Sequence, residues 1–369
     1  MSGIGCRVSG VLTFGRELAI GSVPFTGYRS PFYFLPLLIH VLIPSKNPKM
    51  NYTKLGKNGP EISTVGFGAW GISGRDWGVT DDEKSKKAIH AALDEGVTFI
   101  DTADVYGFGH SEELIREVLD ERSDTDRVVI ATKAGNNFYP FIGQEHKVTP
   151  GNNDYSVKHL VFAAEQSLRR LNVEALDILQ LHSPGLDLLE RDEPWLALER
   201  LKRDGKIKHA GWSVMSFEEN AQAHILERHH ELIDVIQVRY NLLERQAEEV
   251  LLPMAEKHGT GVIIRIPLLF GFLSGKFTAG SNFGENDHRN FNLSPEKLAG
   301  YLKDLAAYKP LFDRFSGYSM AQISLRFCIS HPACHVVIPG GKTLEQVREN
   351  VVASEMDFIS FGEFSMPGN

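Results

Sequence analysis

The sequence predicts an α/β fold, a (β/α)8 TIM barrel with an N-terminal hairpin and long loops on the face where the strands end. Three observations support this prediction. Strand-like and helical patterns alternate from Met50 onward. Most strand-like runs are continuously apolar, as expected for parallel strands that are buried on both faces. No GxGxxG fingerprint follows an early strand, so a closed barrel is favoured over an open dinucleotide-binding sheet.

The predicted strands and helices follow one another along the chain. The strands are expected at Ser63–Gly66, Val97–Asp101, Val128–Thr132, Leu176–His182, Ile207–Ser213, Val235–Tyr240, Thr260–Ile266 and His335–Ile338. The helices are expected at Asp81–Glu95, Ser111–Asp120, Ser156–Leu171, Pro194–Asp204, Ser216–Glu227, Ala247–His258, Met320–Ser330 and Thr343–Ala353. The first helix has Asp81 as a cap and ends at Gly96, which are ordinary start and stop signals.

Two further segments complete the predicted barrel. Residues 51–62 contain a Lys-Asn-Gly turn, and we expect a small hairpin there that closes the bottom of the barrel. Phe270–Tyr308 is long and rich in Gly, Asn, Asp and Lys, which predicts an extended loop after the seventh strand with a short helix at Pro295–Lys303. Long loops at this face usually carry function.

Composition and charge exclude several classes of protein. The net charge of −8, without a basic stripe, argues against a nucleic-acid partner. The three cysteines, Cys6, Cys328 and Cys334, form no CxxC pair, which predicts a reducing, cytoplasmic location. No cluster of residues with metal-ligand spacing is present, so no metal is predicted.

Residues 1–49 differ from the rest of the chain, because they contain arginine, few acids and an apolar run at Pro31–Pro44. That run is too short for a membrane span, which needs about 20 residues. A signal peptide, a transit peptide and a start assigned too early are all open interpretations. We favour the last, with Met50 as the functional start. Residues 1–49 are then an extension that is disordered or not native, ahead of a barrel domain at 50–369.

Polar residues stand where successive predicted strands end. FIDTADVYG places Asp101 and Tyr106 after the second strand, IATK places Lys133 after the third, and LQLH places His182 after the fourth. In a (β/α)8 barrel such ends converge on one site. Alone, each residue has a plainer explanation as a surface tyrosine, helix cap, solvated lysine or structural histidine. Their joint occurrence at consecutive strand ends favours a proton-transfer group.

These residue types suit the reduction of a carbonyl group, which needs a hydride on carbon and a proton on oxygen. An unperturbed tyrosine, with a pKa of about 10, is a poor acid at neutral pH. A nearby ammonium lowers that pKa, and Asp101 would hold the ammonium of Lys133 in place. His182 can hydrogen-bond the substrate oxygen from the other side.

The chain resembles the aldo-keto reductase family, in particular its microbial branch, from about Tyr52 to Ala353. The resemblance is carried, in the family's order and spacing, by LGKNGPEISTVGFGAWGISG, FIDTADVYG with SEELI, ATK, LQLHSP, GWS, QVRYNLLER, PLLFGFLSGKF and VIPGGKTLEQVREN. It implies NADPH-dependent, or NADH-dependent, reduction of aldehydes and ketones, or the reverse oxidation of alcohols and sugars. Small-molecule carbonyl or alcohol substrates are the implied partners.

The resemblance also implies a role for each site residue. Tyr106 is the general acid, Lys133 lowers its pKa, Asp101 partners the lysine and His182 orients the substrate. Ser213 and Gln237 hold the nicotinamide carboxamide, and the loop after the seventh strand covers the pyrophosphate. The full set of implied cofactor contacts is Gly68, Trp70, Ser213, Gln237, Arg265, Pro267, Leu268, Gly271, Lys276, Gly340, Lys342, Gln346, Glu349 and Asn350.

The chain departs from the family pattern at two strand ends. Val214 stands where the family often has Asn, which removes one amide contact to the cofactor. Arg265 and Ile266 stand where the family often has Tyr-Ser. Because a guanidinium stacks on a flat ring, we expect Arg265 to replace the aromatic platform under the nicotinamide.

Two other function classes are open. One is a regulatory barrel that keeps the cofactor, like a potassium-channel β subunit. The other is a Schiff-base enzyme that uses Lys133 as a desolvated nucleophile, against which Asp101, Tyr106 and the cofactor segment argue. Substrate loops are expected at Gly74–Val79, Asn136–Asp154 and Phe270–Asn292. Candidates for the wall of the substrate pocket are Trp77, Phe138, Tyr139 and Phe141.

Overall fold

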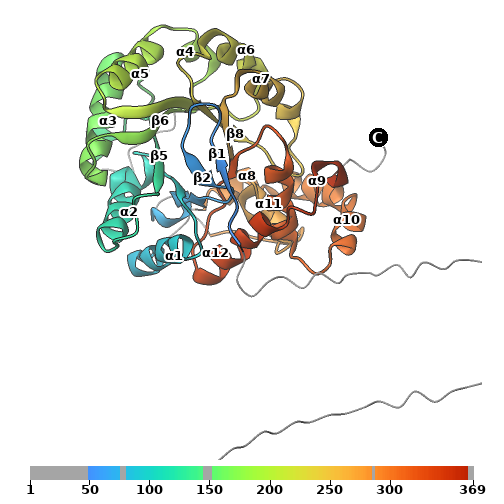
Figure 1. Ribbon diagram of the computed structural model, residues 1–369. Coiled ribbons are helices and arrows are strands. Elements are labelled where there is room, and N and C mark those ends of the chain that lie inside the picture. The colour runs from blue at the N-terminus through green and yellow to red at the C-terminus, as the bar shows by residue number, and fades with distance from the viewer. Residues whose placement is uncertain (1–48, 75–79, 144–151, 285–286, 365–369) are drawn as a thin grey trace, which may run out of the picture. The chain divides into compact units, whose positions relative to one another are not determined.

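The computed structural model describes residues 49–74, 80–143, 152–284 and 287–364. Within these residues, the parallel strands are hydrogen-bonded in the order β10-β9-β8-β7-β6-β5-β4-β3. Bridges from Val65 to Val337 and from Gly68 to Gly340 join the two end strands, so the sheet is closed (Figure 1). The predicted (β/α)8 barrel is therefore confirmed. The expected extension at residues 1–49 lies, apart from Lys49, outside the described residues.

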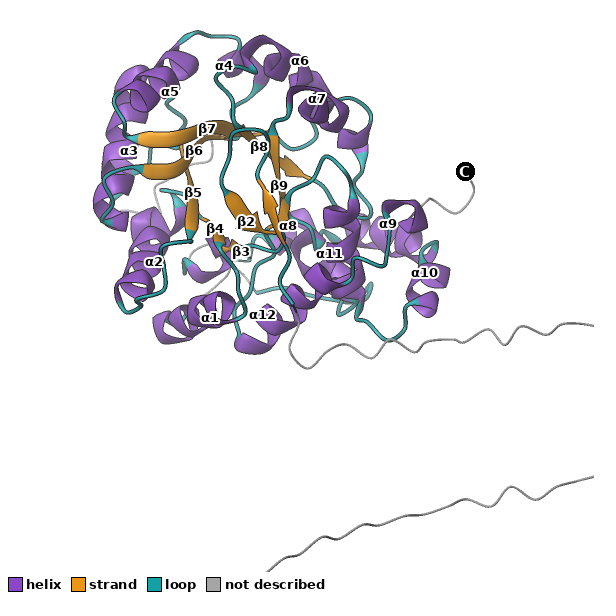
Figure 2. Ribbon diagram, in the orientation of Figure 1, coloured by secondary structure: helices purple, strands orange, loops and turns teal. Residues whose placement is uncertain are grey.

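Helices surround the strands (Figure 2). The barrel strands are β3 Phe67–Gly68, β4 Phe99–Asp101, β5 Val129–Ala134, β6 Leu176–His182, β7 Ile207–Ser213, β8 Val235–Arg239, β9 Gly261–Arg265 and β10 Val336–Val337. The helices are α1 Asp82–Asp94, α2 His110–Asp120, α3 Val157–Leu171, α4 Leu186–Leu189, α5 Glu193–Arg203, α6 Glu219–His229, α7 Leu251–His258, α8 Arg289–Asn292, α9 Pro295–Ala306, α10 Lys309–Arg314, α11 Met320–Ser330 and α12 Leu344–Val351.

The predicted hairpin is present and closes one end of the barrel. Strands β1 (Tyr52–Lys54) and β2 (Glu61–Ser63) pair antiparallel. Leu55 and Ile62 are fully buried and belong to the same apolar cluster as the inner side chains of the barrel strands. Figure 1 shows the hairpin, in blue, lying across the barrel end that faces the viewer. It therefore seals the interior from water at that end.

The prediction of the first barrel strand at Ser63–Gly66 is wrong in its bounds. Ser63 ends hairpin strand β2, and β3 begins at Phe67. No Gly or Pro separates Ile62, which faces the barrel interior, from Val65, which already bridges to β10. Periodicity alone does not separate two such short strands.

The segment after β9 is more helical than predicted. The expected short helix at Pro295–Lys303 extends to Ala306 as α9, and α8 and α10 flank it. Ser294 caps α9 by accepting a hydrogen bond from the backbone of Lys297, and Pro295 occupies its first turn. Its inward residue, Leu298, is fully buried, so packing stabilises the helix within a segment of polar composition.

Inner side chains change from apolar to polar along each strand. Because strand side chains alternate, residues two apart share the inner face. The apolar floor includes Phe99, Ala131, Ile178, Val235 and Ile263. Two positions further along the same strands stand Asp101, Lys133, Gln180, Gln237 and Arg265. The polar layer thus lies at the C-terminal end of the barrel, above a dry core.

No helix in the described part of the chain is long and apolar enough to cross a membrane. Over the same residues, no group of three or more His, Cys, Asp or Glu side chains is placed to hold a metal ion.

Replacing Leu55 with Ala should lower the free energy of unfolding by roughly 2–5 kcal/mol, because it removes a fully buried side chain and leaves a cavity in the barrel floor. Urea denaturation of the purified variant measures this. Leu196→Ala is the matched control, since Leu196 is 52% exposed on α5, and it should change stability by less than about 0.5 kcal/mol. Equal effects of the two changes would show that the hairpin does not seal the core.

Candidate active site

One large cavity of about 810 Å³ opens among the polar strand ends. All fourteen residues that the sequence assigns to cofactor contacts line it, from Gly68 on β3 to Asn350 on α12. Asp101, Tyr106 and His182 line it as well. The fourth candidate, Lys133, lies behind Asp101 and is 1% exposed. The structure therefore brings the sequence-predicted residues together, and their chemical roles remain proposals.

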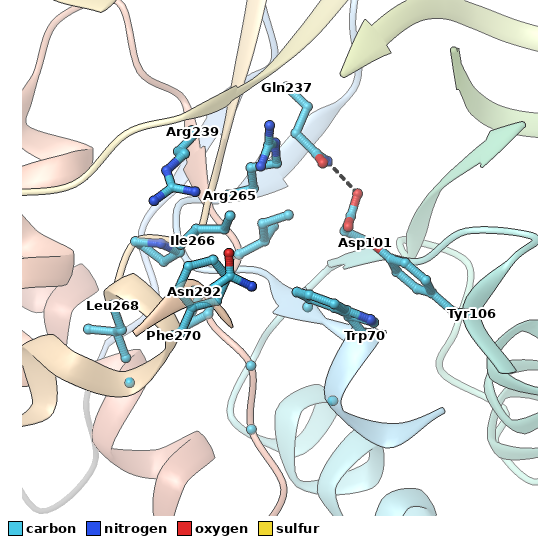
Figure 3. A pocket seen from close by; sticks show the side chains of 18 of the residues that line it. Trp70, Asp101, Tyr106, Gln237, Arg239, Arg265, Ile266, Leu268, Phe270 and Asn292 are labelled. Atoms are coloured by element: carbon cyan, nitrogen blue, oxygen red, sulfur yellow. Dashed lines mark hydrogen bonds between the residues drawn. The ribbon is translucent and has the colours of Figure 1, made fainter. Parts of the chain in front are cut away.

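Lys133 and Asp101 form a buried ion pair at the centre of this group. The Lys133 ammonium donates to both carboxylate oxygens of Asp101, at 2.9 and 2.7 Å, and to the carbonyl oxygen of Thr102 at 2.7 Å. Gln237 donates its amide to Asp101 at 2.6 Å from the opposite strand (Figure 3). All three N–H groups of the lysine are thus used, and it acts on other side chains through its charge.

Burial and charge act in opposite senses on this pair. Burial lowers the pKa of Lys133 below that of a free lysine, while the charge of Asp101 opposes the change. Burial likewise raises the pKa of Asp101, and Lys133 opposes it. Each group therefore depends on the other to remain ionised at a position that is at most 3% exposed.

Tyr106 lies next to this ion pair. Its ring centroid is 5.2 Å from the Lys133 ammonium nitrogen. It opens the 3-10 turn Tyr106–Gly109, in which Gly107 and Phe108 take left-handed backbone conformations, with φ of 60° and 59°. A β-carbon at Gly107 would stand 2.5 Å from the carbonyl oxygen of Ser73. Glycine is needed there, so this turn sets where the tyrosine points.

His182 lies against the edge of the Tyr106 ring, with centroids 5.8 Å apart. Burial lowers its pKa well below that of a free imidazole, and the charges of Lys133 and Arg265 add to the effect. Its Nδ1 is buried and has no hydrogen-bond partner within the described ranges. The imidazole is therefore neutral at neutral pH, with one N–H to offer to a ligand.

The far end of the cavity is formed by the turn before α12. The side chain of Thr343 caps the helix by accepting from the backbone of Gln346. The Gln346 carboxamide oxygen accepts from the backbone N–H of Lys342 at 2.8 Å, and Asn350 donates to Gly340 O at 3.2 Å. These bonds shape the turn and leave the exposed Lys342 side chain at a helix N-terminus, where an anion is favoured.

Several cavity residues were not predicted from the sequence, among them Val105, Phe108, Ser183, Ser216 and Arg239. Others lie within the predicted substrate loops, namely Asn136, Asn137, Asn152, Phe270, Arg289 and Asn292. Period-two alternation could have found Arg239, which lies two residues after Gln237. Of the predicted aromatic wall, Phe138 lines the cavity, Tyr139 stacks behind it at 4.2 Å, Phe141 is not among the lining residues, and Trp77 lies outside the described residues.

The fold and the site define a (β/α)8-barrel oxidoreductase. The Aldo/keto reductase family matches residues 64–361, and the chain belongs to this family. Members of the family carry out nicotinamide-dependent oxidoreduction, which applies in this general form to this chain.

Curated relatives and solved structures agree with this assignment. The chain is 31% identical over 306 residues to aldo-keto reductase YhdN of Bacillus subtilis, covering 81% of this chain and 87% of that protein. It is 31% identical over 321 residues to a probable voltage-gated potassium channel subunit beta of Arabidopsis thaliana, covering 83% of this chain and 92% of that protein.

Among solved structures, the chain is similar to glycerol dehydrogenase AKR11B4 from Gluconobacter oxydans, with a TM-score of 0.67 and 30% identity, covering 84% of this chain and 90% of that one. It is also similar to the holo form of aldo-keto reductase AKR11C1 from Bacillus halodurans, with a TM-score of 0.65, 26% identity, and coverage of 83% and 91%.

Removing one partner of the buried ion pair should lower the free energy of unfolding more than removing both partners. Asp101→Leu leaves the Lys133 charge unpaired, and we expect a loss of about 3–5 kcal/mol in unfolding free energy. The double variant Asp101→Leu/Lys133→Met should recover most of that loss. Chemical denaturation of both variants measures the difference. Asp313→Leu, in the exposed pair of Lys309 and Asp313, is the control and should cost at most about 1 kcal/mol. A double variant no more stable than the single one would contradict this account.

Proposed function

We propose that this protein transfers hydride reversibly between a nicotinamide cofactor, with NADPH preferred over NADH, and the carbonyl group of an aldehyde or ketone, or the corresponding alcohol. The observation that carries the proposal is the placement of Tyr106 next to both the Lys133 ammonium and a neutral His182, at the wall of a cavity of about 810 Å³.

The lining of the cavity fits a nicotinamide cofactor. Its volume of about 810 Å³ is at the upper end of the usual range for small-molecule sites, which reaches roughly 1,000 Å³. Lys276 and Lys342 bring positive charge to the part that would take the phosphates, and Arg289, which is paired with Asp287, also lines the cavity. Gln237 has its amide bound to Asp101, which leaves its carbonyl oxygen to accept from a carboxamide. Ser213 stands beside it in register.

The reaction follows from the side chains. The bound cofactor supplies or accepts the hydride. Tyr106 donates its hydroxyl proton to the carbonyl oxygen, and the Lys133 charge stabilises the tyrosinate that this leaves. Asp101 and Thr102 O hold the ammonium in place. His182, being neutral, donates one hydrogen bond to the same oxygen and does not compete to protonate it.

The substrate side of the cavity is partly amide and partly aromatic. Asn136 and Asn137 follow directly after β5, and Phe108 stacks on Phe138 at 4.8 Å. Carboxamides can donate to and accept from hydroxyl groups. Together with the likeness to a glycerol dehydrogenase, this favours a small hydroxylated aldehyde, ketone or polyol as the substrate.

A regulatory barrel is the second candidate, favoured by the likeness to the plant potassium-channel β subunit over 92% of that protein. A panel of aldehydes, hydroxyketones and polyols, with NADPH and NADH, read at the absorbance of the reduced nicotinamide, separates the two. Turnover of a carbonyl or alcohol supports the enzyme. Cofactor binding without turnover of any panel member supports the regulator.

Tyr106→Phe should retain cofactor affinity and lose about 10²–10⁴-fold in kcat, because it removes only the hydroxyl that gives the proton. The measurement is kcat with the best panel substrate, together with the dissociation constant for the cofactor. Tyr52→Phe makes the same change at the other end of the barrel, where the hydroxyl donates to Gly96 O, and should leave kcat unchanged. Near-normal turnover by Tyr106→Phe would rule out its role as the acid.

Lys342→Ala should raise KM for NADPH and leave KM for NADH nearly unchanged, because only NADPH carries the 2′-phosphate that its ammonium would pair with. The specificity constants for both cofactors, in wild type and variant, measure this. Lys54→Ala, an exposed lysine on the hairpin, is the control. If both cofactors weaken equally, or if wild type prefers NADH, Lys342 does not read the phosphate and Arg289 becomes the next candidate.

A further inference from the structure

Arg265 is a cation in the cavity wall that has no acidic partner in the described part of the chain. One of its terminal nitrogens donates to Val214 O at 2.8 Å and to the hydroxyl of Ser216 at 3.0 Å, both uncharged acceptors. Its Nε is buried and makes no hydrogen bond there. The neighbouring guanidinium, Arg239, is by contrast paired with Glu244 through two hydrogen bonds. This wall of the cavity therefore carries a fixed, uncompensated positive charge.

The groups that surround Arg265 do not cancel this charge. Asp101 is already paired with Lys133. Glu219 of α6 is 1% exposed and contributes attraction, but it forms no ion pair with Arg265. Burial and the charge of Arg239 lower the pKa of Arg265 to about 10, and Tyr106, Glu219 and Asp101 oppose the change. The guanidinium thus remains charged at neutral pH.

Arg265 stands close to the reacting groups. Arg265 lies on β9 and pairs in register with Arg239 of β8, the strand that also carries Gln237. Its charge contributes to lowering the pKa of both His182 and Lys133, which places it within electrostatic reach of the catalytic group. Figure 3 shows Arg239 and Arg265 on one side of the cavity and Tyr106 on the other. A ring that receives hydride next to Tyr106 would therefore lie in the field of Arg265.

We propose that Arg265 makes the site discriminate between the oxidation states of the cofactor, so that the reduced nicotinamide is bound more tightly than the oxidised one. The inference rests on the proposed function, because it requires the nicotinamide beside Tyr106. The oxidised ring carries a positive charge and the reduced ring is neutral, while the adenosine and phosphates are the same in both. The half-buried guanidinium of Arg265 repels only the oxidised ring, and the partly desolvated wall of the cavity strengthens that repulsion.

This discrimination affects both directions of the reaction. In carbonyl reduction, hydride leaves the reduced ring for the carbonyl carbon, Tyr106 protonates the oxygen, and the ring becomes the charged form that Arg265 repels. The oxidised cofactor is then released readily. In alcohol oxidation, hydride moves to the charged ring while Tyr106, as tyrosinate, takes the hydroxyl proton. The repulsion is relieved in that step, so the internal equilibrium is shifted toward the reduced cofactor.

The test compares dissociation constants of NADPH and NADP⁺ by calorimetry in wild type, Arg265→Met and Arg265→Lys. Wild type should bind NADPH at least about tenfold more tightly, equivalent to about 1.4 kcal/mol. Arg265→Met removes the charge and keeps an unbranched side chain, so the ratio should fall toward one. Arg265→Lys keeps the charge and loses the planar fork, so both forms weaken while the ratio stays near that of wild type.

A probe without the nicotinamide separates an effect of Arg265 on the ring from an effect on the phosphates. The 2′-phosphorylated form of ADP-ribose lacks the nicotinamide, and its affinity should be the same within about twofold in all three proteins. The proposal is overturned if wild type binds both cofactor forms equally, or if Arg265→Met weakens the binding of both forms by the same factor. It is also overturned if Arg265→Met weakens binding of the probe as much as binding of NADPH. If Arg265→Met does not fold, Arg265→Gln takes its place, and equal binding of both cofactor forms by wild type overturns the proposal in either case. Binding of neither form by wild type would instead refute the proposed function.

Discussion

The ion pair between Lys133 and Asp101 places the strictest demand on this barrel, because neither charge is stable there alone. Moving one such charge from water into a protein interior costs several kcal/mol, which the partner offsets only when the remaining hydrogen bonds are also satisfied. The structure meets this condition with Thr102 O and the amide of Gln237. The strands β4, β5 and β8 must therefore hold their registers, since a slip of one residue would turn Asp101, Lys133 or Gln237 out of the barrel.

Closure of the barrel keeps this pair dry. At Gly68 a β-carbon would stand 2.7 Å from Ile338 O, so glycine lets β3 approach β10 closely enough to complete the cylinder. Leu55 and Ile62 of the hairpin close the opposite end. Water is thereby excluded from the hairpin end of the barrel, and the Lys133 ammonium is only 1% exposed.

The sequence predicted most of the barrel because most of its strands are continuous apolar runs. The bounds of β6 and β7 match the prediction, and the four candidate catalytic residues follow from strand ends. The prediction was wrong at β3, where one apolar stretch serves both the hairpin and the barrel. It also missed α8, α10 and the last three residues of α9, because these lie in a polar segment that was predicted as an extended loop with one short helix. These errors share a cause, which is that tertiary packing decides the structure of short or polar segments.

The sequence predicted most of the residues that line the candidate site, but not which of its cations are paired with carboxylates. Alternation marks Arg239 and Arg265 as inner residues, yet it says nothing about which carboxylates reach them. Glu244 meets Arg239 because Asn241 builds a tight turn after β8, accepting the backbone N–H of Glu244 and donating to its carboxylate. Val214 and Ser216 reach Arg265 from the neighbouring end of β7 and its loop. Such pairings depend on loop geometry, which the sequence pattern leaves undetermined.

This charge balance connects stability to function. Lys133, Arg170 and Arg239 each form an ion pair with a carboxylate, which is the arrangement that stability alone would favour for a covered cation. Arg265 has neutral acceptors instead, although Glu219 lies close enough to influence it. A cation that is left uncompensated in a cavity lowers the stability of the empty protein, so such a group marks a functional position. The phosphates of a dinucleotide do not account for it, because Lys276 and Lys342 also line the cavity and are suited to bind them. The remaining variable charge of the cofactor is on the nicotinamide ring itself, and this is the charge that a cation facing Tyr106 would detect.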